Sequence, residues 1–352
     1  MQRGFRDRDY VETREGFFFT VVGNIHPDDR VLAYLKYVKS EAGKWGRGES
    51  KYQRAIEQYT IPHLMGTFDF LRKNAPQYLF HSDVHNITFS AVPLREMSKH
   101  YLPEDRLAEL LEKKELDLLE KNTVELTRIL SEESNVPINS FGVTGSLLVG
   151  VHQIRFSDID LTVYGRENSS AVRKTLLSLF ENRKKELTRF KGKILRDWCE
   201  WKARLYPVTQ HEADRIYQRK WNRGLFKNIL FSIHPTKTES EVSEKYGERR
   251  YTPIQMVEVK ARVVDSTDAM FLPATYIIEN VEMLSGQRVQ GVREIVSFEG
   301  LYGDLASEGE EVFARGKLEK VENSRTGETY YRVFVGSTEA KGSDYIKLAS
   351  WR

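Results

Sequence analysis

Cysteine and long apolar runs are the two features that this 352-residue chain most clearly lacks. Cys199 is its only cysteine, so an intrachain disulfide is impossible and a cysteine-based metal centre is disfavoured. No stretch has the length and apolarity of a transmembrane helix, and residues 1–10 are highly charged, unlike a signal peptide. We therefore expect a cytoplasmic protein that works in a reducing compartment and does not associate with membranes.

A large net charge is also lacking, because 54 Lys and Arg oppose 51 Asp and Glu. The charge is nevertheless unevenly distributed. Residues 183–227, here called the basic segment, contain fourteen Lys or Arg, five Asp or Glu and three of the five tryptophans, which gives a net charge of +9. Cations bind phosphates and aromatic faces stack on unpaired bases, but a solvated pair of amphipathic helices would show the same composition. The candidate nucleic-acid contacts are Lys191, Lys193, Arg219 and Lys220.

The order of strand-like and helical patterns predicts an α+β protein with three domains. Residues 1–102 contain several strand-like runs and are expected to form an N-terminal α+β domain. Residues 103–252 begin with a long helical stretch, in which a break is expected near residues 115–117, and continue with short strands. This pattern predicts a central α/β domain with a mixed sheet and the basic segment as a helical insertion. Residues 253–352 alternate strands with glycine turns, which predicts a β-rich, barrel-like domain.

One short segment, residues 141–165, combines two features that suit phosphate and metal binding. Asp158 and Asp160 alternate with apolar residues on a predicted strand, so both carboxylates lie on one face, about 7 Å apart. Such carboxylates repel each other unless a cation lies between them, and their oxygens suit Mg²⁺ or Mn²⁺. Upstream, Gly145 and Ser146 lead from a strand into a short helix, where backbone N–H groups and a hydroxyl can bind phosphate. Each feature alone is typical of an ordinary turn, but their order along the chain favours a site.

This ordered set of residues resembles the signature of the DNA polymerase beta-like nucleotidyltransferase superfamily, in which Gly-Ser and Asp-x-Asp are separated by roughly ten residues. The whole chain also resembles an uncharacterised branch of predicted archaeal nucleotidyltransferases, to which residues 9–37 contribute. The resemblance implies two Mg²⁺ ions on three carboxylates and a nucleoside triphosphate on the Gly-Ser turn. An acceptor hydroxyl attacks the α-phosphate in this chemistry and expels pyrophosphate.

The resemblance assigns Asp158 and Asp160 to metal binding and catalysis, and Gly145 and Ser146 to the triphosphate. The third carboxylate has no obvious match in this sequence. In the superfamily it comes from a later strand that pairs beside the Asp-x-Asp strand. Residues 228–233 contain no acid, so Glu258 is the candidate, although its pattern also suits an ordinary half-buried strand.

Two functions therefore stay open at the level of sequence. The first is metal-dependent transfer of a nucleoside monophosphate from a triphosphate to a hydroxyl, with RNA as the expected acceptor and tRNA as one candidate RNA. A protein or a small molecule stays open as an alternative acceptor. The position of the basic segment directly after the predicted site favours this function. The second is a non-catalytic protein that keeps the nucleotidyltransferase fold and binds RNA or a ribonucleoprotein, which the missing third carboxylate favours.

Overall fold

The computed structural model of the protein describes residues 3–56, 60–182 and 186–351. Its internal contacts divide the chain into two units, each assembled from separated segments. Unit 1 consists of Met1–Ala55, Ala91–Lys191 and Trp221–Ser243, and unit 2 consists of Ile56–Ser90, Gly192–Lys220 and Glu244–Arg352. The predicted α+β class is confirmed, because helices and three sheets are both present. The three predicted domains, with boundaries at 102 and 252, stay a prediction.

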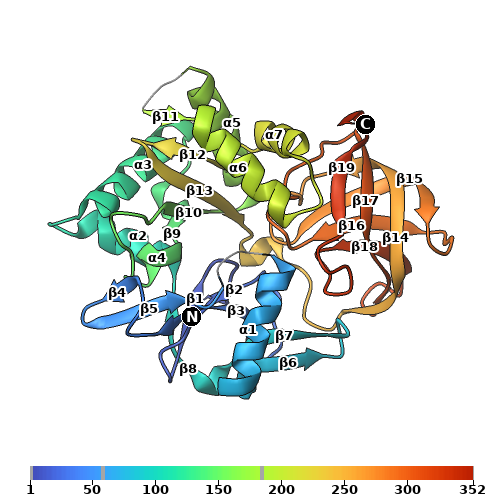
Figure 1. The fold of residues 1–352 in the computed structure, drawn as a ribbon, viewed down its shortest axis with the longest axis horizontal. Coiled ribbons are helices and arrows are strands. Elements are labelled where there is room, and N and C mark those ends of the chain that lie inside the picture. The colour runs from blue at the N-terminus through green and yellow to red at the C-terminus, as the bar shows by residue number, and fades with distance from the viewer. Residues whose placement is uncertain (1–2, 57–59, 183–185, 352) are drawn as a thin grey trace. The chain divides into compact units, whose positions relative to one another are not determined.

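The N-terminal part of unit 1 is an antiparallel sheet with strand order β4-β5-β3-β2-β1-β8 (Figure 1). Its strands are β1 Tyr10–Thr13, β2 Phe18–Val21, β3 Arg30–Lys39, β4 Trp45–Arg47, β5 Ser50–Arg54 and β8 Met97–Tyr101. Aromatic side chains favour strands and are buried in this sheet; Phe18, Phe19 and Tyr37 are fully buried. These strands agree with the runs predicted for residues 1–102.

The second sheet of unit 1 is mixed, with strand order β11-β12-β13-β10-β9. Its strands are β9 Phe141–Val143, β10 Ile159–Tyr164, β11 Leu187–Thr188, β12 Arg223–Phe226 and β13 Ile229–Thr236. The central strand β10 runs parallel to β13 and antiparallel to β9. The short helix α4, Gly145–Leu148, follows β9 directly.

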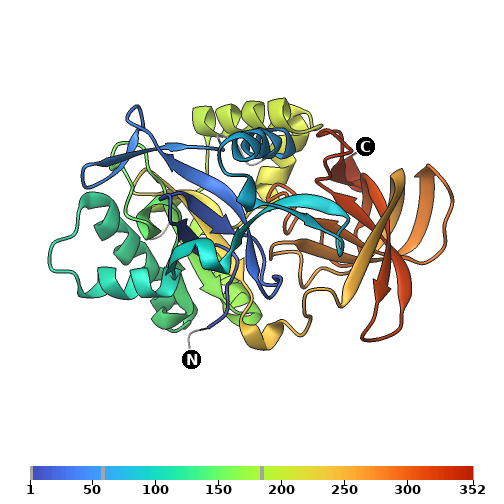
Figure 2. The same ribbon diagram turned by 90° about the horizontal axis from the view of Figure 1, so that it is seen from below.

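Three longer helices pack on this sheet through one apolar core (Figure 2). They are α2 Pro103–Glu112, α3 Leu118–Ser134 and α5 Arg166–Glu181. The break between α2 and α3 matches the interruption expected near residues 115–117. Asp117 causes it, because its side chain accepts a hydrogen bond from the backbone N–H of Glu120 and forms a capping box that starts α3.

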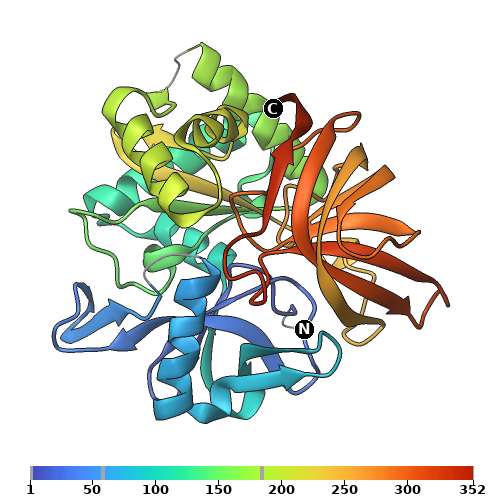
Figure 3. The same cartoon turned by 45° about the vertical axis from the view of Figure 1, so that its right-hand side comes forward.

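Unit 2 contains a β-rich part and several helices. Its elements are α1 Ile61–Asn74, β6 Leu79–Ser82, most of β7 Ile87–Pro93, α6 Gly192–Leu205, α7 Gln210–Arg219, β14 Arg249–Asp265, β15 Ala274–Ser285, β16 Val292–Ser297, β17 Glu311–Asn323, β18 Thr329–Val335 and β19 Tyr345–Leu348. Strand β14 pairs with both β15 and β17, so five strands close in the order β14-β15-β16-β18-β17 (Figure 3). The expected β-rich, barrel-like texture after residue 253 is therefore present. Within the described part of the chain, no helix is long and apolar enough to cross a membrane.

Candidate active site

The Asp-x-Asp strand of unit 1 has one buried apolar face and one polar face, as its alternation predicts. Three side chains of β10 lie fully inside the core: Ile159, Leu161 and Val163. Asp160 points to the other face and Asp158 directly precedes the strand. In the parallel register with β13, Asp160 lies opposite Ser232 and Thr162 lies opposite His234. The polar face of β10 is thus continued by polar residues of its neighbour.

The Gly-Ser turn lies directly against this polar face. Gly145 has φ +68°, a left-handed conformation that glycine adopts without strain. A Cβ atom at this position would lie 2.3 Å from Oδ2 of Asp160, so only glycine fits between the backbone and the carboxylate. Ser146, next to it, is buried. The structure therefore brings together two of the predicted elements, the glycine of the turn and an aspartate of the pair.

Strand β13 contributes a serine that the sequence patterns did not indicate, Ser232, and a histidine, His234. The hydroxyl of Ser232 donates to Oδ1 of Asp160 over 2.5 Å and lies 2.8 Å from Nε2 of His234. The same histidine nitrogen is 3.6 Å from the Asp160 carboxylate. In a serine-hydrolase triad the two ring nitrogens face the serine and the acid separately. Here both groups approach one nitrogen, so the arrangement is not such a triad.

The two carboxylates ionise differently because of their surroundings. The negative charge of Asp160, together with burial, raises the pKa of Asp158 to about 6. Burial alone would raise the pKa of Asp160 as well, but hydrogen bonds with His234 and Ser232 hold this pKa well below its usual value. Burial lowers the pKa of His234 to about 4, so its ring is neutral at pH 7. Like charges close together in a buried position are stabilised by a cation.

Three cations from the N-terminal part of unit 1 also act on this carboxylate pair. Arg8 acts electrostatically on Asp160, Arg54 acts on Asp158, and Lys36 acts on both. Lys36 is almost fully buried, and burial together with the charge of Arg54 lowers its pKa to about 7. The hydroxyl of Thr144, just before the Gly-Ser turn, donates to the carbonyl oxygen of Arg8 over 2.7 Å and links the two sheets. The site is thus built by both sheets of unit 1.

Glu258 does not occupy the position that sequence reasoning gave it. The strands that pair with β10 are β13 and β9, whereas Glu258 lies on β14, which pairs with β15 and β17 in unit 2. Its carboxylate accepts a hydrogen bond from the hydroxyl of Tyr345 over 2.7 Å. The expectation that its strand pairs beside the Asp-x-Asp strand is therefore wrong. The residue next to Asp160 on the adjacent strand is Ser232.

The basic segment forms helices, as predicted, but two of its four selected cations are engaged in internal contacts. Arg219 donates to both carboxylate oxygens of Glu310, and buried Lys220 donates to the carbonyl oxygens of Gly300 and Gly303. Both groups thus have internal partners within unit 2, and their role as nucleic-acid contacts stays a prediction. Residues 183–185 of the segment lie outside the described residues.

The other two cations of the segment lie at the surface. Lys191 and Lys193 are exposed, and Lys193 forms an ion pair with Asp197 one helical turn away, at 2.5 Å. Such an exposed pair contributes little to stability, so both lysines stay candidates for a phosphate contact.

A second cluster of acidic residues in unit 1 stabilises the start of helix α3. Within the described chain, Asp117, Glu120 and His152 are grouped closely enough to hold a metal ion. Asp117 and Glu120 already form the capping box of α3, and Glu120 pairs with Arg106 and Lys113 at 2.9 and 2.6 Å. Its negative charge is therefore compensated by neighbouring cations.

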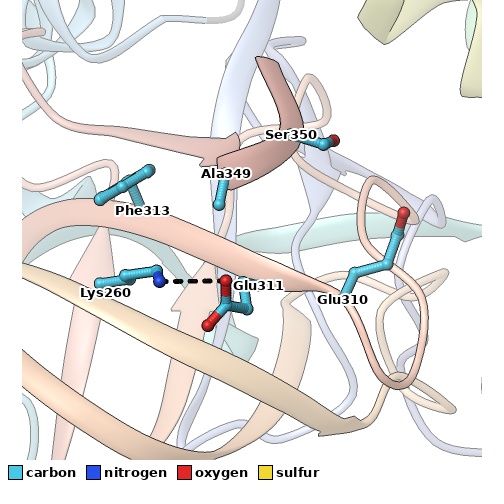
Figure 4. Close-up of a pocket in the computed structure, with 6 residues that line it drawn as sticks. All are labelled: Lys260, Glu310, Glu311, Phe313, Ala349 and Ser350. Carbon is cyan, nitrogen blue, oxygen red and sulfur yellow. Dashed lines mark ion pairs between the residues drawn. The ribbon is translucent and has the colours of Figure 1, made fainter. Parts of the chain in front are cut away.

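Unit 2 contains an open pocket of about 440 Å³ near the end of the chain (Figure 4). It is lined by Lys260, Glu310, Glu311, Phe313, Ala349 and Ser350. Lys260 points to Glu311 and forms an ion pair with it at 3.0 Å. None of the residues predicted for metal, nucleotide or nucleic-acid binding lines this pocket.

The fold and the site together define a mixed α+β protein with a half-buried carboxylate pair next to a glycine turn. No family model matches the chain, and no solved structure matches it. The chain is 32% identical over 349 residues to the uncharacterized protein MJ1086 of Methanocaldococcus jannaschii, an alignment that covers 97% of this chain and 98% of that protein. The chain belongs to the same family as this protein.

Proposed function

We propose that the protein is a metal-dependent nucleotidyltransferase that moves a nucleoside monophosphate from a triphosphate to a hydroxyl of RNA. The observation that carries the proposal is the contact between the turn and the carboxylate pair, in which Gly145 leaves no space for a side chain beside Asp160. A phosphate at this turn and a cation on the carboxylates would be immediate neighbours. Phosphoryl transfer uses this combination of groups.

The residues present suit a divalent cation. Asp158 and Asp160 provide hard oxygen ligands, and the raised pKa of Asp158 reflects the repulsion that a cation would relieve. Mg²⁺ or Mn²⁺, when bound there, would hold the triphosphate and stabilise negative charge on the transferred phosphate. The implied third carboxylate is not matched, because Ser232 and neutral His234 lie on the adjacent strand. We therefore propose one ion at the aspartate pair. No ligand set is identified for the second ion that the resemblance implies.

The chain's own cations have a separate part in this proposal. Arg8, Arg54 and the protonated form of Lys36 act electrostatically on the carboxylates, and their positive charge would offset the negative charge of a triphosphate. The backbone N–H groups of the turn at Gly145 and Ser146 would orient the phosphates. Lys191 and Lys193 are the exposed cations proposed to contact the RNA acceptor.

A second candidate function is RNA binding without nucleotidyl transfer. The observation that favours it is Ser232, an uncharged residue at the position next to Asp160 on the neighbouring strand. Five-stranded barrels of the OB type bind oligonucleotides, and unit 2 also closes five strands. However, residues 244–352 contain fifteen Lys or Arg and eighteen Asp or Glu, a net charge of −3 that disfavours binding to a polyanion. We therefore rank this function second.

The test combines metal binding with turnover. The wild-type protein and an Asp158→Asn, Asp160→Asn double variant are titrated with Mn²⁺ by calorimetry and incubated with labelled triphosphates, Mg²⁺ or Mn²⁺, and total RNA. We expect Mn²⁺ binding and label transfer in the wild type and neither in the double variant. Asp83→Asn, which removes a carboxylate that is 92% exposed, is the charge control. Transfer by the double variant would refute the assignment, and RNA binding without transfer by the wild type would favour the second function.

A further inference from the structure

Two exposed apolar side chains lie immediately before the carboxylate pair. Ile154 and Phe156 are 53% and 52% exposed, and both belong to the turn that leads into Asp158. The ring of Phe156 meets the ring of Trp45 edge to face, with 5.4 Å between centroids. The guanidinium of Arg54 lies 4.9 Å from the centroid of Trp45. We call these four residues, Trp45, Arg54, Ile154 and Phe156, the aromatic platform.

The exposure of the platform does not come from a loose segment. The carbonyl oxygen of Gln153 accepts hydrogen bonds from the backbone N–H groups of Phe156 and Ser157 at 3.2 and 2.9 Å. In return, the backbone N–H of Gln153 donates to the Ser157 hydroxyl over 2.9 Å. The backbone N–H of Gly46, beside Trp45, donates to the carbonyl oxygen of Val151 over 3.1 Å and ties the β4–β5 hairpin to the turn. The turn is therefore held by several hydrogen bonds while Ile154 and Phe156 stay exposed in it.

The charge next to the platform restricts what it can bind. Arg54 packs on Trp45 and also acts electrostatically on Asp158, so it joins the apolar surface to the carboxylate site. A flat ring that is covalently attached to phosphate suits such a surface, because the ring stacks while the phosphate meets the cations. A purely apolar ligand would gain nothing from Arg54. The combination is that of a nucleotide site.

We propose that the aromatic platform binds the base of the nucleoside triphosphate. This inference rests on the proposed function, which brings the phosphates to Gly145 and Ser146. Stacking is tolerant of base identity, because every base has an aromatic face. The site should therefore gain affinity from the base and discriminate little between ATP and GTP.

The test compares two probes that differ only in the presence of a nucleoside. Calorimetry with Mn²⁺ measures the binding of ATP and of inorganic tripolyphosphate. We expect the wild type to bind ATP more tightly than tripolyphosphate. Phe156→Ala should weaken ATP binding by roughly 5- to 150-fold, the range for loss of one stacking partner, and leave tripolyphosphate binding unchanged. Phe156→Trp should retain ATP affinity.

A matched control removes another exposed apolar side chain of unit 1. Leu118 is 58% exposed at the start of α3, and Leu118→Ala should not change ATP binding. Because Phe156 is half exposed, its variants should keep the wild-type melting temperature, which verifies that they fold.

The possible failures are distinguishable. If the wild type binds ATP and tripolyphosphate equally, the inference is overturned while the proposed function stands. If ATP binding survives in Phe156→Ala but RNA binding falls, the platform binds the acceptor and the inference is wrong. Binding of neither ATP nor tripolyphosphate by the wild type would reject the proposed function, and the inference with it.

Discussion

Two charge clusters, one in each unit of the molecule, are arranged in opposite ways. In unit 2, the carboxylate of Glu319 pairs with Lys317 at 3.0 Å and with Arg332 at 2.8 Å, and all three side chains are less than a tenth exposed. In unit 1, Asp158 and Asp160 bring two like charges together, and burial leaves one of them with a raised pKa. The first arrangement pairs each charge with an opposite one, whereas the second keeps two acids side by side.

This difference separates a structural role from a functional one. Desolvation already makes a buried ion pair costly, and removal of one partner adds a further penalty because the other charge loses its compensation. A pair of like charges is costly as it stands and becomes favourable when a cation is bound. Proteins commonly give up stability in this way at functional sites. We therefore expect the two arrangements to respond differently when one charged group is removed.

The largest effect is expected from breaking the ion pairs of unit 2. Arg332 contacts Glu319 and also stacks on Tyr251, with its guanidinium 3.6 Å from the ring centroid. Arg332→Met should lower the free energy of unfolding by up to about 3–5 kcal/mol, because Glu319 keeps only Lys317 as a buried partner and the stacking on Tyr251 is lost. Urea unfolding measures this. The control is Arg293→Met, which removes a pair with Glu328 that is about half exposed, and should cost less than about 1 kcal/mol. Equal losses in both variants would contradict the comparison.

Glu299 of unit 2 differs from the ion-paired cluster of that unit, because it is a buried acid with a raised pKa. Burial, and then the charge of Asp344, raises the pKa of Glu299 to about 8. The folded state therefore holds a proton that the unfolded state releases near pH 4.5, so stability should fall as the pH rises from about 4.5 to 8. The fall should amount to about 2–4 kcal/mol, since a tenfold difference in proton affinity between the two states corresponds to about 1.4 kcal/mol. Glu299→Gln should remove it.

Urea unfolding at pH 5, 7 and 9 measures this pH dependence in the wild type and in Glu299→Gln. Glu339→Gln serves as the control, because the pKa of Glu339 is lowered and its effect has the opposite sign. A wild-type protein whose stability is constant over this range would show that Glu299 is ionised at neutral pH.

Removal of the repulsion between Asp158 and Asp160 should stabilise the protein, but it should also abolish the proposed metal site. With a raised pKa, the Asp158 carboxyl costs stability as the pH rises from about 4 to 6, and the full cost is present at pH 7.5. Asp158→Asn should therefore raise the free energy of unfolding by about 1–3 kcal/mol without divalent cations. Added Mn²⁺ should stabilise the wild type but not the variant. A variant that is less stable than the wild type would indicate that the Asp158 charge is structurally required.

Two glycines with the same φ angle give the smallest and most specific test. Gly145 and Gly150 both have φ +68°, but a Cβ at Gly150 would meet no atom within 4 Å, whereas at Gly145 it would meet Asp160. Both alanine variants should lose about 1–2 kcal/mol from the left-handed backbone. Only Gly145→Ala should also weaken Mn²⁺ binding, by about tenfold or more, because it displaces the Asp160 carboxylate. Calorimetry that finds the same Mn²⁺ affinity in both variants would contradict the site geometry.

The parts of the site that are close in sequence could be predicted from local patterns. Alternation along residues 158–164 correctly separated the buried face from the polar face, and the Gly-Ser turn lies where the motif suggests. The helices at 103–134 and their interruption were equally visible. These features depend on side-chain periodicity and capping, which act over a few residues.

The long-range parts of the site could not be predicted in this way. Lys36 lies in the largely apolar strand β3, and the residue pattern of this strand does not indicate that Lys36 interacts with Asp158 and Asp160. These two residues follow more than a hundred positions later in the chain. Glu258 has the alternation of a half-buried strand, but alternation does not specify which sheet a strand joins. Ser232 became part of the site only through the parallel pairing of β13 with β10. Arg219 carries the right charge for phosphate, yet charge alone does not reveal an internal partner such as Glu310.

The alternation of the chain between the two units has a consequence for how the protein is made. Six segments alternate between unit 1 and unit 2, so the chain crosses from one to the other five times. During synthesis, β10 emerges from the ribosome long before β13, and the neighbour of Asp160 is missing until residue 232 has been added. No single cut in the gene separates the two units, so neither can be exchanged with another protein by one recombination event. The two units are therefore expected to be inherited together.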